Sequence, residues 1–135
     1  MHVFLTSLQA YNVMFKLLED FYNKTKSDDI GSLLGIMCFF PDGGTADPAI
    51  WHDWQKATEQ KKALSTQEAF DGMIKFIEIY HGFTSSEDAK SILDEMRLAE
   101  KCSDVQVHIV SLWNLFLRQV LQEPKDSKEY LTPAE

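Results

Sequence analysis

Apolar positions recur three and four residues apart over most of the chain, as they do along the buried face of an amphipathic helix. The first such stripe follows a capping box formed by Thr6 and Gln9. The second follows Ser27, a favourable helix N-cap with two acidic residues after it. A third begins at Asp47, where Pro48 takes the first helical position. No stretch keeps the alternation of a strand, so the pattern predicts an all-α fold.

The same pattern occurs twice along the chain, at one constant spacing in the numbering. Residues 5–60 align with residues 64–119 without a gap, and fourteen positions are identical. We interpret this as two tandem copies of a three-helix unit, which predicts about six helices packed as a pseudo-twofold pair. The identical positions fall on helix caps and apolar stripes: Leu5/Leu64, Ala10/Ala69, Met14/Met73, Lys16/Lys75, Glu19/Glu78, Thr25/Thr84, Ser27/Ser86, Asp29/Asp88, Ser32/Ser91, Leu34/Leu93, Met37/Met96, Ile50/Ile109, Trp54/Trp113 and Gln60/Gln119.

The second copy carries its own start signals. Ser65 and Glu68 form the capping box of its first helix, and Ser86 is the N-cap of its middle helix. Its third helix is predicted to begin near Ser103 or Asp104. In both copies the shared spacing places one tryptophan on the inward face of the third helix.

The length of 135 residues is enough for one domain with a core of its own. Pro124 is predicted to end the last helix, because proline cannot continue the hydrogen-bond ladder. We therefore expect a single helical domain over residues 1–123, followed by a frayed polar tail over residues 124–135.

The net charge of the chain limits the kind of molecule that it could bind. The net charge is −8 and the isoelectric point is about 4.9. Phosphate groups would be repelled, which argues against nucleic acid or an anionic membrane and favours a basic protein. No apolar run reaches the roughly 18 residues that a membrane span needs, and the first residues lack a basic leader pattern. We expect a cytoplasmic protein.

Residues that could carry chemistry are scattered. The four histidines have no helical metal-site spacing, and no CxxC, HExxH, GxSxG or phosphate-loop motif occurs. Cys38 and Cys102 are interpreted as two reduced thiols, and the run 42–44 as a turn rather than a calcium loop. We therefore expect no catalytic site, no metal and no cofactor.

The acidic residues suggest two candidate surfaces for a partner. One centres on Trp51, which lies about 300° around the third helix from Trp54 and could anchor an interface. The other is an acidic ridge on the middle helix of the second copy. Two plainer interpretations stay open: Trp51 could pack against the other copy, and the ridge could be a solvated helix face. The first surface comprises Asp28, Asp29, Asp42, Asp47, Trp51 and Asp53, and the ridge comprises Glu87, Asp88, Asp94 and Glu95.

The stretch from Ser27 to Trp54 reads SDDIGSLLG…PDGGTADPAIWHDW. It resembles the pattern SDDIGxLL…DG…ADPAxWxDW of a group of small acidic bacterial proteins, some of them encoded beside secreted toxins. The chain therefore looks like an immunity protein of the contact-dependent growth inhibition (CDI) type. The second copy departs from this pattern, with Lys90 and Asp94 in place of the two glycines. The resemblance implies a protein with no reaction of its own. Such a protein neutralises a cognate toxin domain, often a basic nuclease, by blocking its active site or the surface that it needs to reach RNA or DNA.

Two other functional classes remain compatible with the sequence. One is an acidic helical adaptor or regulatory protein with no toxin partner, which could be a homodimer through the Trp51 surface. The other is a hydrolase or small-ligand binder with its site between the two copies. The oligomeric state, the toxin activity and the choice between the two acidic surfaces are open at this point.

Overall fold

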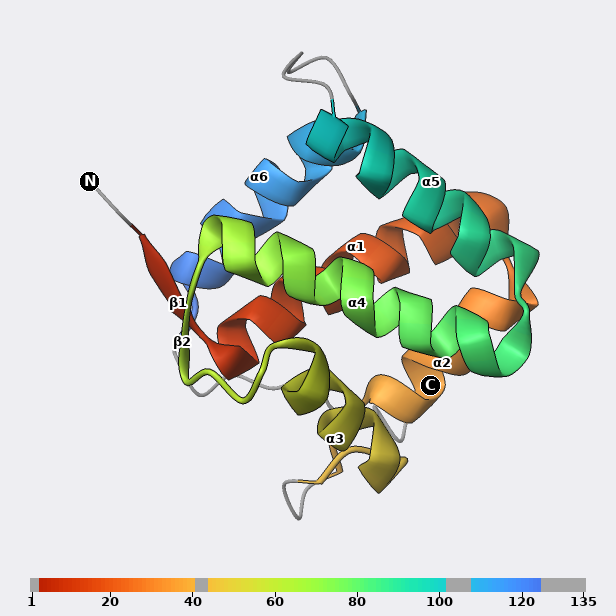
Figure 1. Ribbon diagram of the computed structural model, residues 1–135, viewed down its shortest axis with the longest axis horizontal. Helices are drawn as coiled ribbons and strands as arrows, with labels where there is room; N and C mark the ends of the chain where they lie inside the picture. Colours follow the sequence, from red (N-terminus) through yellow and green to blue (C-terminus); the bar gives the residue numbers. More distant parts are fainter. Residues whose placement is uncertain (1–2, 41–43, 102–107, 125–135) are drawn as a thin grey trace.

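A computed structural model describes residues 3–40, 44–101 and 108–124. Within these residues it contains six helices and one short two-stranded sheet, which confirms the predicted all-α class (Figure 1). The elements in chain order are β1 (Phe4–Thr6), α1 (Ser7–Thr25), α2 (Asp28–Met37), α3 (Pro48–Ala57), β2 (Ala63–Ser65), α4 (Thr66–Thr84), α5 (Glu87–Lys101) and α6 (His108–Leu121).

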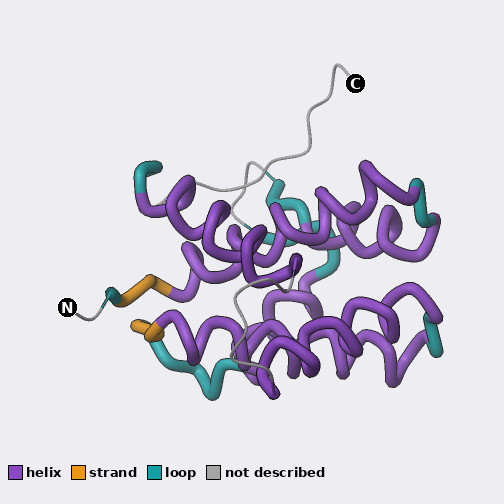
Figure 2. Tube along the Cα trace, turned by 90° about the horizontal axis from the view of Figure 1, so that it is seen from above, coloured by secondary structure: helices purple, strands orange, loops and turns teal. Residues whose placement is uncertain are grey.

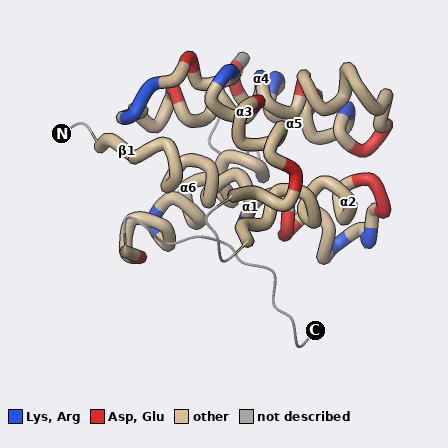
Figure 3. Tube along the Cα trace, turned by 90° about the horizontal axis from the view of Figure 1, so that it is seen from below, with Lys and Arg blue, Asp and Glu red and all other residues tan. Residues whose placement is uncertain are grey.

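The helices lie in two layers (Figures 2 and 3). Helix α1 packs against α2 and α6, and helix α4 packs against α5 and α3. Each layer therefore combines the first two helices of one half of the sequence with the third helix of the other half. The two halves are interleaved, and the apolar stripes of all six helices meet in one core.

The predicted helix starts are confirmed where the structure describes them. Thr6 Oγ1 accepts a hydrogen bond from Gln9 N at 3.0 Å, and Gln9 Oε1 accepts one from Thr6 N at 2.9 Å. Ser65 and Glu68 form the same reciprocal pair at 3.1 and 2.8 Å. Each capping box satisfies backbone N–H groups that have no acceptor inside the helix. As predicted, α1 and α4 begin directly after these caps.

The third helices are described in part. Asp47 caps α3, with its Oδ1 accepting from Ala49 N at 3.0 Å, as predicted. The predicted start at Ser103 or Asp104 lies outside the described residues, and α6 is described from His108. It ends at Leu121, before Pro124, and the tail beyond residue 124 is also outside the described residues.

The sequence pattern missed the small sheet. Strands β1 and β2 run antiparallel, with Leu5 opposite Leu64 and the flanking pairs Phe4–Ser65 and Thr6–Ala63. Strands this short cannot show an alternating pattern, and each has its partner in the other half of the sequence. The register follows the predicted alignment of the two copies, since Leu5 pairs with its own counterpart. Both leucines are buried, so the sheet closes one end of the core.

Two tryptophans fill the core at equivalent places. Trp54 is fully buried, and its Nε1 donates to the carbonyl oxygen and the hydroxyl of Ser7, at 3.1 Å each. Its ring packs edge-on against Tyr11 at 5.9 Å between centroids, and Trp113 packs against Phe70 at 5.1 Å. The second pair is the counterpart of the first in the alignment of the two copies. Equivalent elements and contacts therefore recur at the predicted spacing, while the duplication itself stays a prediction.

Candidate functional site

The N-termini of α2 and α5 meet at one end of the molecule (Figure 1). Ser27 Oγ donates to Asp88 Oδ2 at 2.5 Å, and Ser86 Oγ donates to Asp29 Oδ2 at 2.8 Å. Each serine oxygen also accepts from the backbone N–H three residues ahead, at 3.2 Å in both helices. The N-cap of each helix is thus bonded to an acidic residue in the first turn of the other helix.

This arrangement gathers four carboxylates, which we call the acidic patch: Asp28, Asp29, Glu87 and Asp88. The positive ends of two helix dipoles lie under them and stabilise negative charge there. In the described part of the chain none of the four forms an ion pair with a lysine or arginine. Figure 3 shows acidic segments at the starts of both helices, at the same end of the molecule. The patch therefore carries negative charge that no lysine or arginine among the described residues pairs with.

The four carboxylates do not have the same role. Asp29 and Asp88 hold the serines, so each contributes to the contact between α2 and α5. Asp28 and Glu87 are exposed, and their carboxylates make no hydrogen bond within the described residues. The charge available to a partner is therefore greatest at Asp28 and Glu87.

A tyrosine supports the patch from α4. Tyr80 Oη donates to the backbone carbonyl of Asp29 at 2.9 Å. Partial burial, and then the nearby charge of Asp29, raise the pKa of Tyr80 above its usual range. The hydroxyl accordingly stays protonated at neutral pH and remains a donor.

The structure divides the first predicted surface. Asp47 N donates to Ile36 O, which places the start of α3 near the end of α2. At 1.5 Å per residue, that point lies about 12 Å along α2 from Asp28. Asp47 at the N-cap of α3, and Trp51 and Asp53 on the helix, are therefore separated from Asp28 and Asp29. Asp28 and Asp29 join the second copy's acids instead. Asp42 lies outside the described residues.

Trp51 lies at the edge of the core. Its side chain is half-buried, and its ring contacts Tyr11 at 5.2 Å and Phe39 at 5.7 Å between centroids. Both neighbours belong to the first half of the sequence, so these ring contacts are not with the other copy. The indole is packed in a cluster of aromatic rings and has only part of its surface available to a partner.

The predicted ridge on α5 is also divided. Asp94 forms an ion pair with Lys90 at 3.4 Å, one helical turn away. Glu95 lies on the same face as Asp88, seven residues earlier, and forms no ion pair among the described residues. The ridge thus contributes two charges to the acidic patch, one neutralised charge and one charge beside a pocket.

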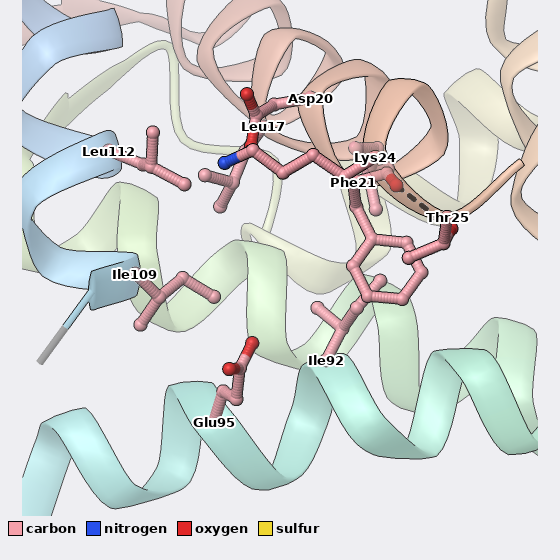
Figure 4. A pocket seen from close by; sticks show the side chains of 10 residues that line it. Leu17, Asp20, Phe21, Lys24, Thr25, Ile92, Glu95, Ile109 and Leu112 are labelled. Atoms are coloured by element: carbon pink, nitrogen blue, oxygen red, sulfur yellow. Dashed lines mark hydrogen bonds and ion pairs between the residues drawn. The ribbon is translucent and has the colours of Figure 1, made fainter.

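That pocket lies between α1, α5 and α6 and has a volume of about 220 Å³ (Figure 4). Its lining is mostly apolar, with Glu95 projecting from α5 towards it. Sequence patterns did not reveal it, since its apolar residues look like ordinary core stripes. The lining residues are Leu17, Leu18, Asp20, Phe21, Lys24, Thr25, Ile92, Glu95, Ile109 and Leu112.

The described residues contain neither a metal-binding cluster nor a membrane-spanning helix. No group of three or more histidine, cysteine, aspartate or glutamate side chains there could hold a metal ion. None of the described helices is long and apolar enough to cross a bilayer. Cys38 is buried at the end of α2, where its Sγ donates to Leu34 O at 3.3 Å. Cys102 lies outside the described residues.

The chain matches no family model, no curated protein and no solved structure. The resemblance to immunity proteins therefore rests on the motif in residues 27–54 alone.

Proposed function

We propose that this protein is a cytoplasmic immunity protein that binds and neutralises a toxin domain, a basic nuclease, through the acidic patch. The observation that carries the proposal is the gathering of Asp28, Asp29, Glu87 and Asp88 without a basic partner in the described residues. A nuclease presents cationic side chains where it holds phosphates, and carboxylates can occupy the same positions. The motif that resembles immunity proteins begins at this patch.

Electrostatics explains what the patch would contribute. Complementary charge accelerates association to about 10⁸–10⁹ M⁻¹s⁻¹ at low salt, against roughly 10⁵–10⁶ M⁻¹s⁻¹ for neutral surfaces. Fast capture matters for an inhibitor that must bind a nuclease before the nuclease reaches nucleic acid. The link between Ser27 and Asp88 and its counterpart between Ser86 and Asp29 hold two of the four carboxylates in place before binding, which reduces the conformational entropy lost on association.

The test uses the candidate toxin from the gene neighbourhood. We expect a large secreted protein to be encoded directly upstream of this chain, and its C-terminal domain to be toxic when expressed in the cytoplasm. Coexpression of the native chain should restore growth, and the purified pair should form a complex. If no such reading frame exists, or if growth is not restored, the proposal is wrong.

Two variants of equal charge locate the binding surface. The double variant Asp28→Asn/Glu87→Gln removes two charges from the patch and leaves both serine–aspartate hydrogen bonds intact. We expect the association rate constant to fall about tenfold at low salt, and the difference to shrink as salt is added. The control, Asp53→Asn with Glu59→Gln, removes the same charge elsewhere and should leave the rate near the native value. Equal losses in both variants would show that net charge acts without a defined patch.

A further inference from the structure

The pocket between α1, α5 and α6 lies near the acidic patch. Thr25 lines the pocket and is two residues from Ser27, whose hydroxyl bonds to Asp88. On α5, Ile92 and Glu95 follow Asp88 at the i+4 and i+7 positions, so all three share one face of the helix. Glu95 is about 10 Å from Asp88 along that face. A partner covering roughly 800 Å² of this protein would span both features.

The size and lining of the pocket define its occupant. A volume of about 220 Å³ is below the roughly 300–1,000 Å³ of pockets that hold small-molecule ligands, and suits a single side chain. Its walls are the apolar side chains of Leu17, Leu18, Phe21, Ile92, Ile109 and Leu112.

Three charged side chains border the pocket: Asp20 and Lys24 from α1 and Glu95 from α5. Lys24 Nζ contacts Asp20 Oδ2 at 2.9 Å, so these rim charges balance each other. Glu95 projects towards the space between Ile92 and Ile109, and it has no ion pair within the described residues (Figure 4). The pocket therefore combines an apolar body with one uncompensated carboxylate.

The other half of the molecule is built differently at the equivalent place. The counterpart of Leu17 is Phe76, which is buried and packs against Trp54 at 6.1 Å between ring centroids. The counterpart of Glu95 is Ile36, which is packed against the core. Phe76 is thus larger than Leu17, and Ile36 is apolar where Glu95 is charged. Leu17 in the pocket wall and the carboxylate of Glu95 are therefore not required by the shared helical pattern.

We propose that this pocket anchors the basic partner by receiving one of its lysine or arginine side chains. The alkyl stem would lie against the leucine and isoleucine walls, and the cationic head would pair with Glu95. A single long side chain placed in a fitted pocket beside a charged surface is a common form of interface anchor. This inference rests on the proposed function, because it takes the basic partner from there.

The first experiment uses small cations in place of the unidentified partner. The full chain, labelled at isoleucine and leucine methyl groups, is titrated with n-butylguanidinium and separately with neutral n-pentanol. We expect saturable methyl shifts at Ile92, Ile109 and Leu112, with tighter binding of the cation. Glu95→Gln should weaken cation binding about two- to fivefold, the range for an exposed ion pair, and leave pentanol binding unchanged.

Two further variants separate the pocket from general charge. Asp94→Asn removes one charge from the adjacent position on α5 and should leave cation binding at its native value. Leu17→Phe introduces the side chain present in the other half and should abolish saturable shifts from both compounds. A thermal melt shows whether the Leu17→Phe variant remains folded. If that variant unfolds, Glu95→Gln still tests the pocket, because Glu95 is exposed.

The outcomes that overturn the inference are distinct. Absence of saturable shifts in the native chain, equal binding of pentanol and the cation, or equal effects of Glu95→Gln and Asp94→Asn would each refute a cation anchor. None of these measurements involves the toxin domain, so the pocket inference can fail while growth protection is observed. Conversely, intact cation binding without growth protection would refute the proposed function alone.

Discussion

Two glycines of α2 show how different reasons can place the same residue in a helix. A methyl group added at Gly31 would lie 2.7 Å from Cε1 of Tyr22, so the tyrosine ring of α1 would have to shift to admit one. A methyl group added at Gly35 meets no atom within 4 Å. Glycine inside a helix costs roughly 0.5–1 kcal/mol relative to alanine, because it loses more backbone freedom on folding. Packing offsets that cost at Gly31 and not at Gly35.

This contrast predicts opposite effects of one substitution at the two positions. Gly35→Ala should raise the free energy of unfolding by about 0.5–1 kcal/mol. Gly31→Ala should lower it by about 1–3 kcal/mol, because the Tyr22 ring must move from its packed position. Urea denaturation of both variants measures the two changes. Stabilisation by both substitutions would show that the tyrosine ring moves aside at little cost.

At the scale of elements, the contact between α2 and α5 depends on two reciprocal hydrogen bonds. Each serine acts twice, accepting from its own helix and donating to an aspartate of the other helix. Removing one hydroxyl therefore leaves an amide without its cap and an aspartate without its donor. The two links are equivalent in the alignment of the two copies, so they should have similar energies.

We expect Ser27→Ala and Ser86→Ala each to lower the free energy of unfolding by about 1–3 kcal/mol, because each removes two interactions. Loss of an N-cap costs about 0.5–2 kcal/mol, and loss of a hydrogen bond to a charged group adds to it. The matched control is Ser32→Ala, an exposed serine inside α2, which should change stability by less than about 0.5 kcal/mol. Chemical denaturation measures all three variants, and a large effect at only one of the two caps would contradict their equivalence.

For the whole molecule, the decisive feature is the exchange of third helices between the layers. Helix α3 packs on α4, and α6 packs on α1, so neither half of the sequence holds all the helices of one layer. The bond from Trp54 Nε1 to Ser7 connects the layers, as does the β1–β2 sheet. The apolar side chains of both halves pack in one shared core, which makes the two halves one cooperative unit.

Dividing the chain tests this interdependence. We expect fragments 1–60 and 61–135 to show little helical circular dichroism separately at micromolar concentration, since isolated helices of this length are marginal in water. An equimolar mixture should recover helical signal and a cooperative melt. A fragment that melts cooperatively as a monomer would show that one half folds without the other.

The pattern of caps and apolar stripes was sufficient to predict the all-α class, both capping boxes and the N-caps Ser27 and Asp47, because these depend on residues three or four positions apart. It was also sufficient to identify Trp54 and Trp113 as inward-facing residues. The same local rules could not predict β1 and β2, which are very short and have distant partners.

The sequence by itself determined the composition of the candidate surfaces, and the tertiary structure decided their grouping. Acidic residues at helix starts are visible as local patterns, so Asp28, Asp29, Glu87 and Asp88 were all identified. Their meeting depends on the crossing of α2 and α5, which brings residues from the two halves of the chain into hydrogen-bond contact. The pocket beside Glu95 likewise arises only where α1, α5 and α6 converge, because a cavity is a property of packed side chains from several elements and leaves no periodic signal in any one of them.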